Sequence, residues 1–285
     1  MSEEGFSRYP FGIKPDNITS MSILNAIIMG LVQGITEFLP ISSSGHLVIF
    51  SKILDLGNVF IFDVLLNFGS LLALIIYYRK RILSIIVRIF SGKEWLLVAK
   101  VVAATIPAVL IGLVFNDQIE KLNSLIWVVI TTLMLVGILM IVAGNAKKGA
   151  DDREIEKSVG WRLAVKTGLA QALALIPGVS RSGITILTGL RNNLSAARAA
   201  EFSFLLAIPI IAGASFKMLV STEGIDFIKN NMAAFVVGNI VSFVSGILAI
   251  GFLINLISKR GLKDFGWYRV GLASLLIVLC LFGAF

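Results

Sequence analysis

The chain has 285 residues, of which 57% are hydrophobic and only 15% are charged, and its mean hydropathy is +0.92. A soluble domain needs a more polar surface, so this composition excludes a soluble globular protein and predicts an all-α polytopic membrane protein. The formal net charge of +8 would favour nucleic acid binding in a soluble protein. In a membrane protein it reports topology instead, and we expect no nucleic acid partner.

Six apolar segments are predicted to span the membrane. Before them, residues 1–20 are polar and are expected to form an N-terminal extension. Each of the six segments has close to the ~20 apolar residues that a bilayer-crossing helix needs. They cover residues 59–78, 95–115, 124–143, 202–220, 232–257 and 267–285.

Two further apolar segments, residues 22–54 and 161–190, are interrupted near their middle. The interruptions are Pro40-Ile-Ser-Ser-Ser-Gly-His46 and Pro177-Gly-Val-Ser-Arg-Ser-Gly183. Because Pro ends helices and Ser starts them, each segment is predicted to form two half-helices in a re-entrant hairpin that does not cross. Irregular backbone persists at membrane depth only where protein or a water-filled cavity surrounds it. The two hairpin tips are therefore expected to meet in a polar interior.

The two interrupted segments also resemble each other in sequence. Gly30-Leu-Val-Gln33 matches Gly168-Leu-Ala-Gln171, and twelve residues separate each Gln from Gly45 or Gly183. Such self-similarity is typical of a duplicated structural unit. The similarity continues in Phe62-Asp-Val-Leu-Leu and Phe202-Ser-Phe-Leu-Leu.

Basic residues gather in four clusters that alternate with loops holding few of them, and the positive-inside rule places all four in the cytoplasm. Each copy of the duplicated unit would hold three spans, and an odd number of crossings turns the second copy upside down. The sequence therefore predicts an inverted-topology repeat of residues 21–143 and 161–285, joined by a cytoplasmic linker at 144–160. The clusters are Arg79, Lys80, Arg81, Arg88 and Lys93; Lys147, Lys148, Arg153, Lys157, Arg162 and Lys166; Arg191 and Arg198; and Lys259, Arg260, Lys263 and Arg269.

The first interruption carries the candidate catalytic carboxylate. Gln33 and Glu37 are four residues apart, so they share one face of a half-helix and point toward the Ser-rich turn. Ionisable residues inside membrane segments are costly and usually functional. Two structural alternatives stay open: Glu37 could be retained only as the partner of Arg181, and the serines could simply cap a helix. His46 is the chain's one histidine, and a lone histidine is often structural.

The second interruption carries the candidate phosphate-binding groups. The run Ser180-Arg181-Ser182-Gly183 opens a half-helix. It offers hydroxyls, a guanidinium and backbone N–H groups, which are the groups that hold phosphate oxygens in proteins. We therefore expect an anionic phosphate as the ligand.

Both interruptions lie within longer motifs, Gln33-Gly-Ile-Thr-Glu-Phe-Leu-Pro-Ile-Ser-Ser-Ser-Gly-His46 and Pro177-Gly-Val-Ser-Arg-Ser-Gly-Ile-Thr185. With these motifs the chain resembles the undecaprenyl-diphosphatases, also called bacitracin-resistance proteins, from about residue 22 to its C-terminus. The resemblance implies hydrolysis of undecaprenyl diphosphate to the monophosphate and inorganic phosphate at the outer face of the plasma membrane. In that family the reaction recycles the lipid carrier for cell-wall peptidoglycan synthesis and confers bacitracin resistance. Shorter matches are Ala104-Thr-Ile-Pro107, Phe202-Ser-Phe-Leu-Leu-Ala-Ile-Pro209 and Tyr268-Arg269.

The motifs and the resemblance together give each residue an expected role. Arg181 would neutralise the diphosphate, and Ser43 would be the nucleophile, with His46 or Glu37 as its base. The family implies a divalent cation, Ca²⁺ or Mg²⁺, for which Glu37 is the candidate ligand. Zinc is not expected without further His or Cys ligands. The expected substrate-binding residues are Gln33, Ser42, Ser44, Ser180, Ser182, Gly183 and Thr185.

Two alternative functions compete with this interpretation. A type 2 phosphatidic acid phosphatase would share Ser44-Gly45-His46, but its mechanism needs a second histidine, and the chain has one. A secondary transporter or polyisoprenyl-phosphate flippase would share the inverted repeat and the broken helices. Phosphate release in detergent, where no gradient exists, separates an enzyme from a carrier.

Overall fold

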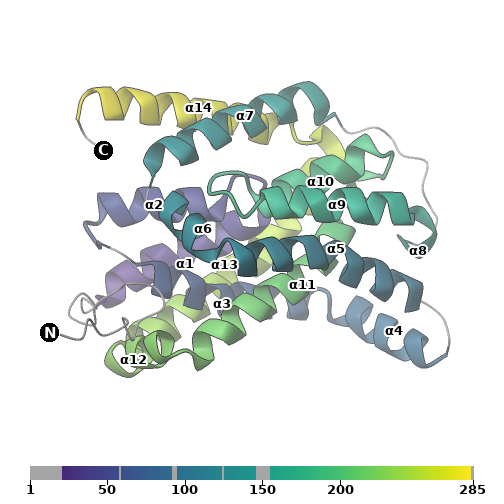
Figure 1. The fold of residues 1–285 in the computed structure, drawn as a ribbon, viewed down its shortest axis with the longest axis horizontal. Coiled ribbons are helices and arrows are strands. Elements are labelled where there is room, and N and C mark those ends of the chain that lie inside the picture. Colours follow the sequence, from purple (N-terminus) through teal and green to yellow (C-terminus); the bar gives the residue numbers. More distant parts are fainter. Residues whose placement is uncertain (1–20, 58, 92–94, 124, 146–154, 284–285) are drawn as a thin grey trace, which may run out of the picture.

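The computed structural model describes residues 21–57, 59–91, 95–123, 125–145 and 155–283. Within these residues every regular element is an α-helix (Figure 1). The predicted N-terminal extension and residues 146–154 of the predicted linker lie outside the described residues. The helices are α1 (Ile23–Phe38), α2 (Ser43–Ile53), α3 (Phe60–Tyr77), α4 (Arg79–Phe90), α5 (Trp95–Val114), α6 (Asn116–Asn123), α7 (Ile126–Ala143), α8 (Ile155–Ser158), α9 (Trp161–Leu173), α10 (Arg181–Arg191), α11 (Ala196–Val220), α12 (Thr222–Asn230), α13 (Met232–Arg260) and α14 (Lys263–Leu281).

Six of these helices are long and apolar enough to cross a membrane, namely α3, α5, α7, α11, α13 and α14. They coincide with the six predicted spans, so the chain is a multi-pass membrane protein. Their outer faces keep large apolar side chains exposed, such as Leu248 in α13 at 69%, because lipid and not water covers them. Helix α11 starts earlier than predicted, at Ala196. Its first turns can be charged because Glu201 pairs with Arg198 at 2.8 Å and with Arg81 of α4 at 2.9 Å.

The two interrupted segments form pairs of short helices, α1 with α2 and α9 with α10. These helices have 16, 11, 13 and 11 residues, each shorter than the ~20 residues that a span needs. Helix α1 ends before Pro40, since a residue preceding proline is disfavoured in helical conformation. A new helix begins at Ser43. In the second segment α9 ends at Leu173, four residues before Pro177, and α10 begins at Arg181.

Small residues bring the helices close together around the centre of the molecule. Gly30 and Gly34 of α1 lie directly against the backbone of α13 at Gly238 and Ser242, where a Cβ on either glycine would collide. Gly168 of α9 packs in the same way on α5. Such contacts let helix axes approach closely within a membrane. Helices α7 and α14 pack together along the upper edge of Figure 1. The α1–α2 and α9–α10 turns meet below this pair of helices.

One basic residue is not where the charge pattern placed it. Arg269 was predicted to belong to a cytoplasmic cluster, and that prediction is wrong. Helix α14 begins at Lys263, so Arg269 lies inside the helix and is 0% exposed. Its guanidinium donates to the carbonyls of Pro40 (3.3 Å), Gly178 (2.6 Å) and Thr132 (3.3 Å). Arg269 therefore connects both interruptions to each other and to α7.

Candidate active site

The α1–α2 turn and the α9–α10 turn have the same local structure. Ser42 and Ser180 both have positive φ, 76° and 72°, a conformation that few residues other than glycine adopt. Each caps the helix that follows it, because its Oγ accepts a hydrogen bond from Gly45 N (3.3 Å) or Gly183 N (3.2 Å). The capping role that the sequence left open for the first turn is confirmed at Ser42, and Ser180 has the same role in the second turn. Ser43 and Arg181 then occupy equivalent places as the first residue of α2 and of α10.

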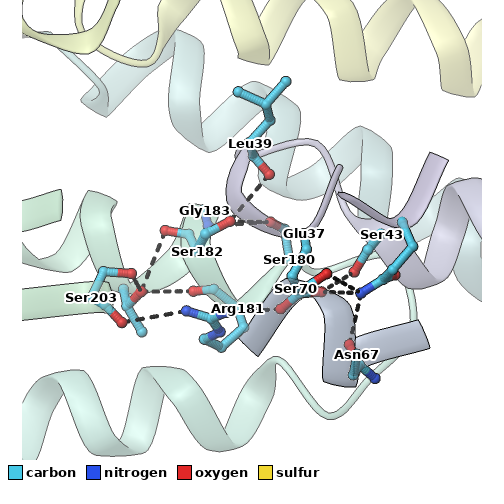
Figure 2. Close-up of polar contacts among 12 residues, drawn as sticks. Glu37, Leu39, Ser43, Asn67, Ser70, Ser180, Arg181, Ser182, Gly183 and Ser203 are labelled. Atoms are coloured by element: carbon cyan, nitrogen blue, oxygen red, sulfur yellow. Dashed lines mark hydrogen bonds and ion pairs between the residues drawn. The ribbon is translucent and has the colours of Figure 1, made fainter. Parts of the chain in front are cut away.

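Glu37 lies at the centre of the contacts between the two turns (Figure 2). Its Oε1 accepts a hydrogen bond from Arg181 Nη2 at 2.8 Å, and its Oε2 accepts one from Ser43 Oγ at 2.7 Å. The side chains of Glu37 and Arg181 are only 11% and 12% exposed. The structure thus brings together three of the four predicted catalytic residues, and the predicted meeting of the two turns is confirmed.

Gln33, the second predicted polar residue of α1, contacts side chains of helix α3. Gln33 Nε2 donates to Asn67 Oδ1 at 2.7 Å and lies 3.4 Å from Ser70 Oγ, as well as 3.2 Å from Glu37 Oε2. Asn67 and Ser70 were not predicted from the sequence. Their spacing places them on one face of α3, and this polar stripe within an apolar span was the signal that could have identified them.

Arg181 is oriented from a second side by helix α11. Its Nη1 donates to the backbone carbonyl of Ser203 at 3.3 Å, while Nη2 contacts Glu37. The guanidinium is planar and rigid, so two contacts on different nitrogens fix its direction. Ser203 was not predicted as part of the site, because a backbone carbonyl leaves no mark in the sequence.

A cavity of about 510 Å³ opens beside these residues. Five predicted site residues line it: Gln33, Glu37, Ser43, Ser44 and Arg181. The rest of its wall is largely apolar and comes mainly from α2, α3, α5, α9 and α11. Its further polar members are Ser51, Lys52, Asp63, Asn67 and Gln171. A small polar end within an apolar wall suits a ligand that joins a phosphate group to a hydrocarbon chain.

His46 lies away from this cavity. It is 5% exposed and is not among the residues of the cavity wall. Its Nδ1 is 2.7 Å from the carbonyl oxygen of Ser42, and its Nε2 is 2.7 Å from the hydroxyl of Tyr268, on whose ring it stacks. Both ring nitrogens are thus occupied by groups other than Ser43. Of the two predicted bases, the structure brings only Glu37 to Ser43.

The remaining predicted substrate-binding residues lie beneath the turns. Ser182 Oγ donates to the Leu39 carbonyl at 3.1 Å, and Thr185 Oγ1 is 2.6 Å from Ser203 Oγ. Both residues are absent from the cavity wall, as are Ser42, Ser180 and Gly183. Their role as phosphate ligands stays a prediction, and in this structure their contacts hold the two turns in place.

The donor atoms in the cavity suit a hard cation such as Ca²⁺ or Mg²⁺, since they are carboxylate, amide and hydroxyl oxygens. In the described part of the chain, no group of three or more His, Cys, Asp or Glu residues is arranged to hold a metal ion. Glu37 already contacts Arg181 and Ser43. Asp63 is different, because its buried Oδ1 has no hydrogen-bond partner within the described residues.

Comparison with known proteins identifies the family of the chain. Residues 26–275 match the family described as bacitracin resistance protein BacA. The chain belongs to the BacA family. Family members named undecaprenyl-diphosphatase include one from Porphyromonas gingivalis strain W83, which is 38% identical over 92% of this chain and 98% of its own length. Another, from Rubrobacter xylanophilus, is 42% identical over 92% of this chain and 99% of its own length.

Proposed function

We propose that this BacA-family chain hydrolyses undecaprenyl diphosphate to undecaprenyl monophosphate and inorganic phosphate. The observation that carries the proposal is the Ser43–Glu37–Arg181 contact chain at the polar end of a largely apolar cavity. These three residues offer a nucleophile, a base and a cationic guanidinium within one site. Relatives of the protein are named undecaprenyl-diphosphatase. The reaction would recycle a lipid carrier for cell-wall synthesis and confer bacitracin resistance.

In the first step, Ser43 Oγ attacks the terminal phosphorus of the diphosphate. Glu37 Oε2 accepts the hydroxyl proton along the existing 2.7 Å hydrogen bond. The bond between that phosphorus and the bridging oxygen breaks, and the lipid monophosphate leaves with the electron pair. The product on the protein is a phosphoserine. The departing lipid monophosphate takes the proton from Glu37, which is then a carboxylate again. In the second step water attacks the phosphorus of the phosphoserine and Glu37 takes a proton from the water. The bond between phosphorus and Ser43 Oγ breaks, Glu37 returns the proton to Oγ, and inorganic phosphate and free Ser43 are formed.

Arg181 stabilises the charge that develops on the equatorial phosphate oxygens during both steps. Its contacts with Glu37 and with the Ser203 carbonyl orient it before the substrate arrives. The starts of helices α2 and α10 lie at the same site and add favourable dipoles for an anion. Ser44 and Gln33 line the cavity and supply further polar contacts.

Glu37 is the base in this mechanism, and His46 has a supporting role. His46 contacts the Ser42 carbonyl and the Tyr268 hydroxyl, so it fixes the turn that carries Ser43. Ser42, Ser180, Ser182, Gly183 and Thr185 support the two turns in a similar way. A divalent cation, Ca²⁺ or Mg²⁺, would supply additional neutralisation of the diphosphate when bound, and Glu37 remains its sequence-predicted ligand.

The proposal includes a topology. Residues 22–54 and 161–190 form two re-entrant hairpins, and the repeats 21–143 and 161–285 have inverted orientation around a cytoplasmic linker at 144–160. The shared turn geometry at Ser42 and Ser180 supports a duplication. The first hairpin enters from outside, so the site faces the outer side of the plasma membrane. Cysteine-accessibility labelling of Ser51→Cys and Lys166→Cys in intact cells tests this orientation, because the first is expected to react from outside and the second only after permeabilisation.

Phosphate release from undecaprenyl diphosphate by the purified chain in detergent tests the proposed activity. Wild-type protein is expected to release phosphate, and Ser43→Ala is expected to release none above background. Ser258→Ala is a control for the loss of a hydroxyl and is expected to release phosphate as the wild type does, since Ser258 is exposed, bonds to Ile254 within α13 and lies outside the cavity wall. Absence of phosphate release by the wild-type chain, with transport of the lipid phosphate across vesicles, would instead support a flippase.

A further inference from the structure

Asp63 is a carboxylic acid in the cavity that the proposed mechanism does not use. It lies in the first turn of α3, within a membrane span, and it lines the same cavity as Glu37 and Ser43. Its Oδ1 is buried and accepts no hydrogen bond from any described residue. A buried carboxyl oxygen without a partner is destabilising, so its retention at this place indicates that a ligand supplies the missing contact.

The two carboxyl groups of the cavity differ in what they can accept. Both oxygens of Glu37 are engaged, Oε1 by Arg181 and Oε2 by Ser43 and Gln33. A cation bound there would displace the catalytic contacts and would be repelled by the guanidinium. Asp63 has no such competitor at Oδ1, so the cavity's available carboxylate ligand is Asp63.

The charge of the substrate also favours a cation beside Asp63. A diphosphate that reaches Ser43 and Arg181 enters a cavity whose wall includes Asp63, and the two anions repel each other at low dielectric. A divalent cation between them converts this repulsion into attraction. Asn67 lies one helical turn after Asp63 on the same face of α3 and also lines the cavity. Its Oδ1 accepts one hydrogen bond from Gln33 Nε2 at 2.7 Å, and the second lone pair of this amide oxygen is of the kind that such cations prefer.

We infer that Asp63 is the protein's carboxylate ligand for the divalent cation that accompanies the diphosphate. The inference rests on the proposed function for the presence of a diphosphate in the cavity, and it moves the cation from Glu37 to Asp63. Water and phosphate oxygens complete the coordination, as is usual for Mg²⁺ and common for Ca²⁺. Glu37 then stays free to act as a base.

The inference is tested by Mn²⁺ binding, followed by electron paramagnetic resonance on the full chain in detergent. Binding is measured with and without methylenediphosphonate, a diphosphate analogue that is not hydrolysed. Asp63→Asn is expected to weaken Mn²⁺ binding by about tenfold or more, because ligand charge sets the affinity of such sites. Asp63→Glu is expected to retain binding. Asp55→Asn removes the same charge from an exposed position outside the cavity wall and is expected to bind Mn²⁺ as the wild type does.

Three results would overturn the inference. The first is wild-type Mn²⁺ affinity in Asp63→Asn, which is the outcome expected if Asp63 is simply a neutral acid. The second is loss of binding in Glu37→Gln with retention in Asp63→Asn. The third is no Mn²⁺ binding by the wild type, with or without the analogue. A thermal unfolding curve for each variant separates lost binding from lost folding, and Asp63→Glu decides the question if Asp63→Asn does not fold. Cation binding through Asp63 without phosphate release would reject the proposed function but would still support a cation site at Asp63.

Discussion

The α1–α2 turn and the α9–α10 turn have the same backbone conformation and differ in the side chains that they present to the cavity. Both use a capping serine with positive φ, and both place one residue at the start of a helix. That residue is Ser43 in the first turn and Arg181 in the second. Four residues after the matching glutamines, the first turn has Glu37 and the second has Leu175. In the proposed mechanism the first turn therefore supplies the groups that attack the phosphate, and the second turn supplies the group that binds it.

Removing the carboxylate from the first turn is expected to have the largest effect on this division. Glu37→Gln keeps the size of the side chain but cannot accept the Ser43 proton, so turnover is expected to fall by about a thousandfold. The measurement is the rate of phosphate release in detergent. A loss below about tenfold would mean that Glu37 is only the partner of Arg181.

Removing the guanidinium from the second turn is expected to cost about a hundredfold in turnover, as for other lost transition-state donors. Arg181→Lys keeps the charge but cannot contact Glu37 and the Ser203 carbonyl together, so it is expected to restore only part of the rate. Steady-state kinetics of both variants test this. Equal rates for Arg181→Lys and wild type would show that charge alone suffices.

The two turns are expected to act as a unit only while Arg269 holds them. Arg269→Met fits the buried space but leaves the carbonyls of Pro40, Gly178 and Thr132 without their donor. Each unsatisfied buried acceptor costs about 1–3 kcal/mol, so the thermal unfolding temperature is expected to fall clearly. Lys263→Met is the control, since Lys263 is exposed at the start of the same helix. Similar unfolding temperatures for the two variants would show that Arg269 does not hold the two turns together.

The smallest effect is expected at Tyr268. Tyr268→Phe removes one hydrogen bond to His46 Nε2, which is worth about 1 kcal/mol, and leaves the Ser43–Glu37 contact in place. We expect a turnover rate within about fivefold of wild type on that scale. A loss as large as that of Glu37→Gln would assign a direct catalytic role to the His46–Tyr268 pair.

The parts of the fold that were predictable from the sequence follow from local physical rules. Span length is set by bilayer thickness, so six runs of apolar residues predicted six spanning helices. Pro40 and the serines after it determined where the first turn lies. The contact between Glu37 and Arg181 was also predictable, because two ionisable residues in apolar surroundings need each other.

The remaining features depend on contacts between residues far apart in the chain. Arg269 was assigned to a cytoplasmic cluster by the positive-inside rule. The backbone carbonyls that satisfy it in the interior are invisible in a sequence. Asn67 and Asp63 were hidden within an apolar span, and Asp63 was noticed only as part of a repeat. His46 follows the Ser-rich turn in sequence, yet helical geometry directs it toward Tyr268 instead of Ser43.

The attack of Ser43 on the phosphate is the step on which the proposed mechanism depends. It is tested most directly with undecaprenyl diphosphate labelled with ³²P in the terminal phosphate, mixed with the protein and quenched in acid within one turnover. We predict acid-stable label on Ser43, located by peptide mass spectrometry, and no label in Ser43→Ala. Normal turnover by Ser43→Ala, with no labelled protein in the wild type, would contradict the account and indicate direct attack by water.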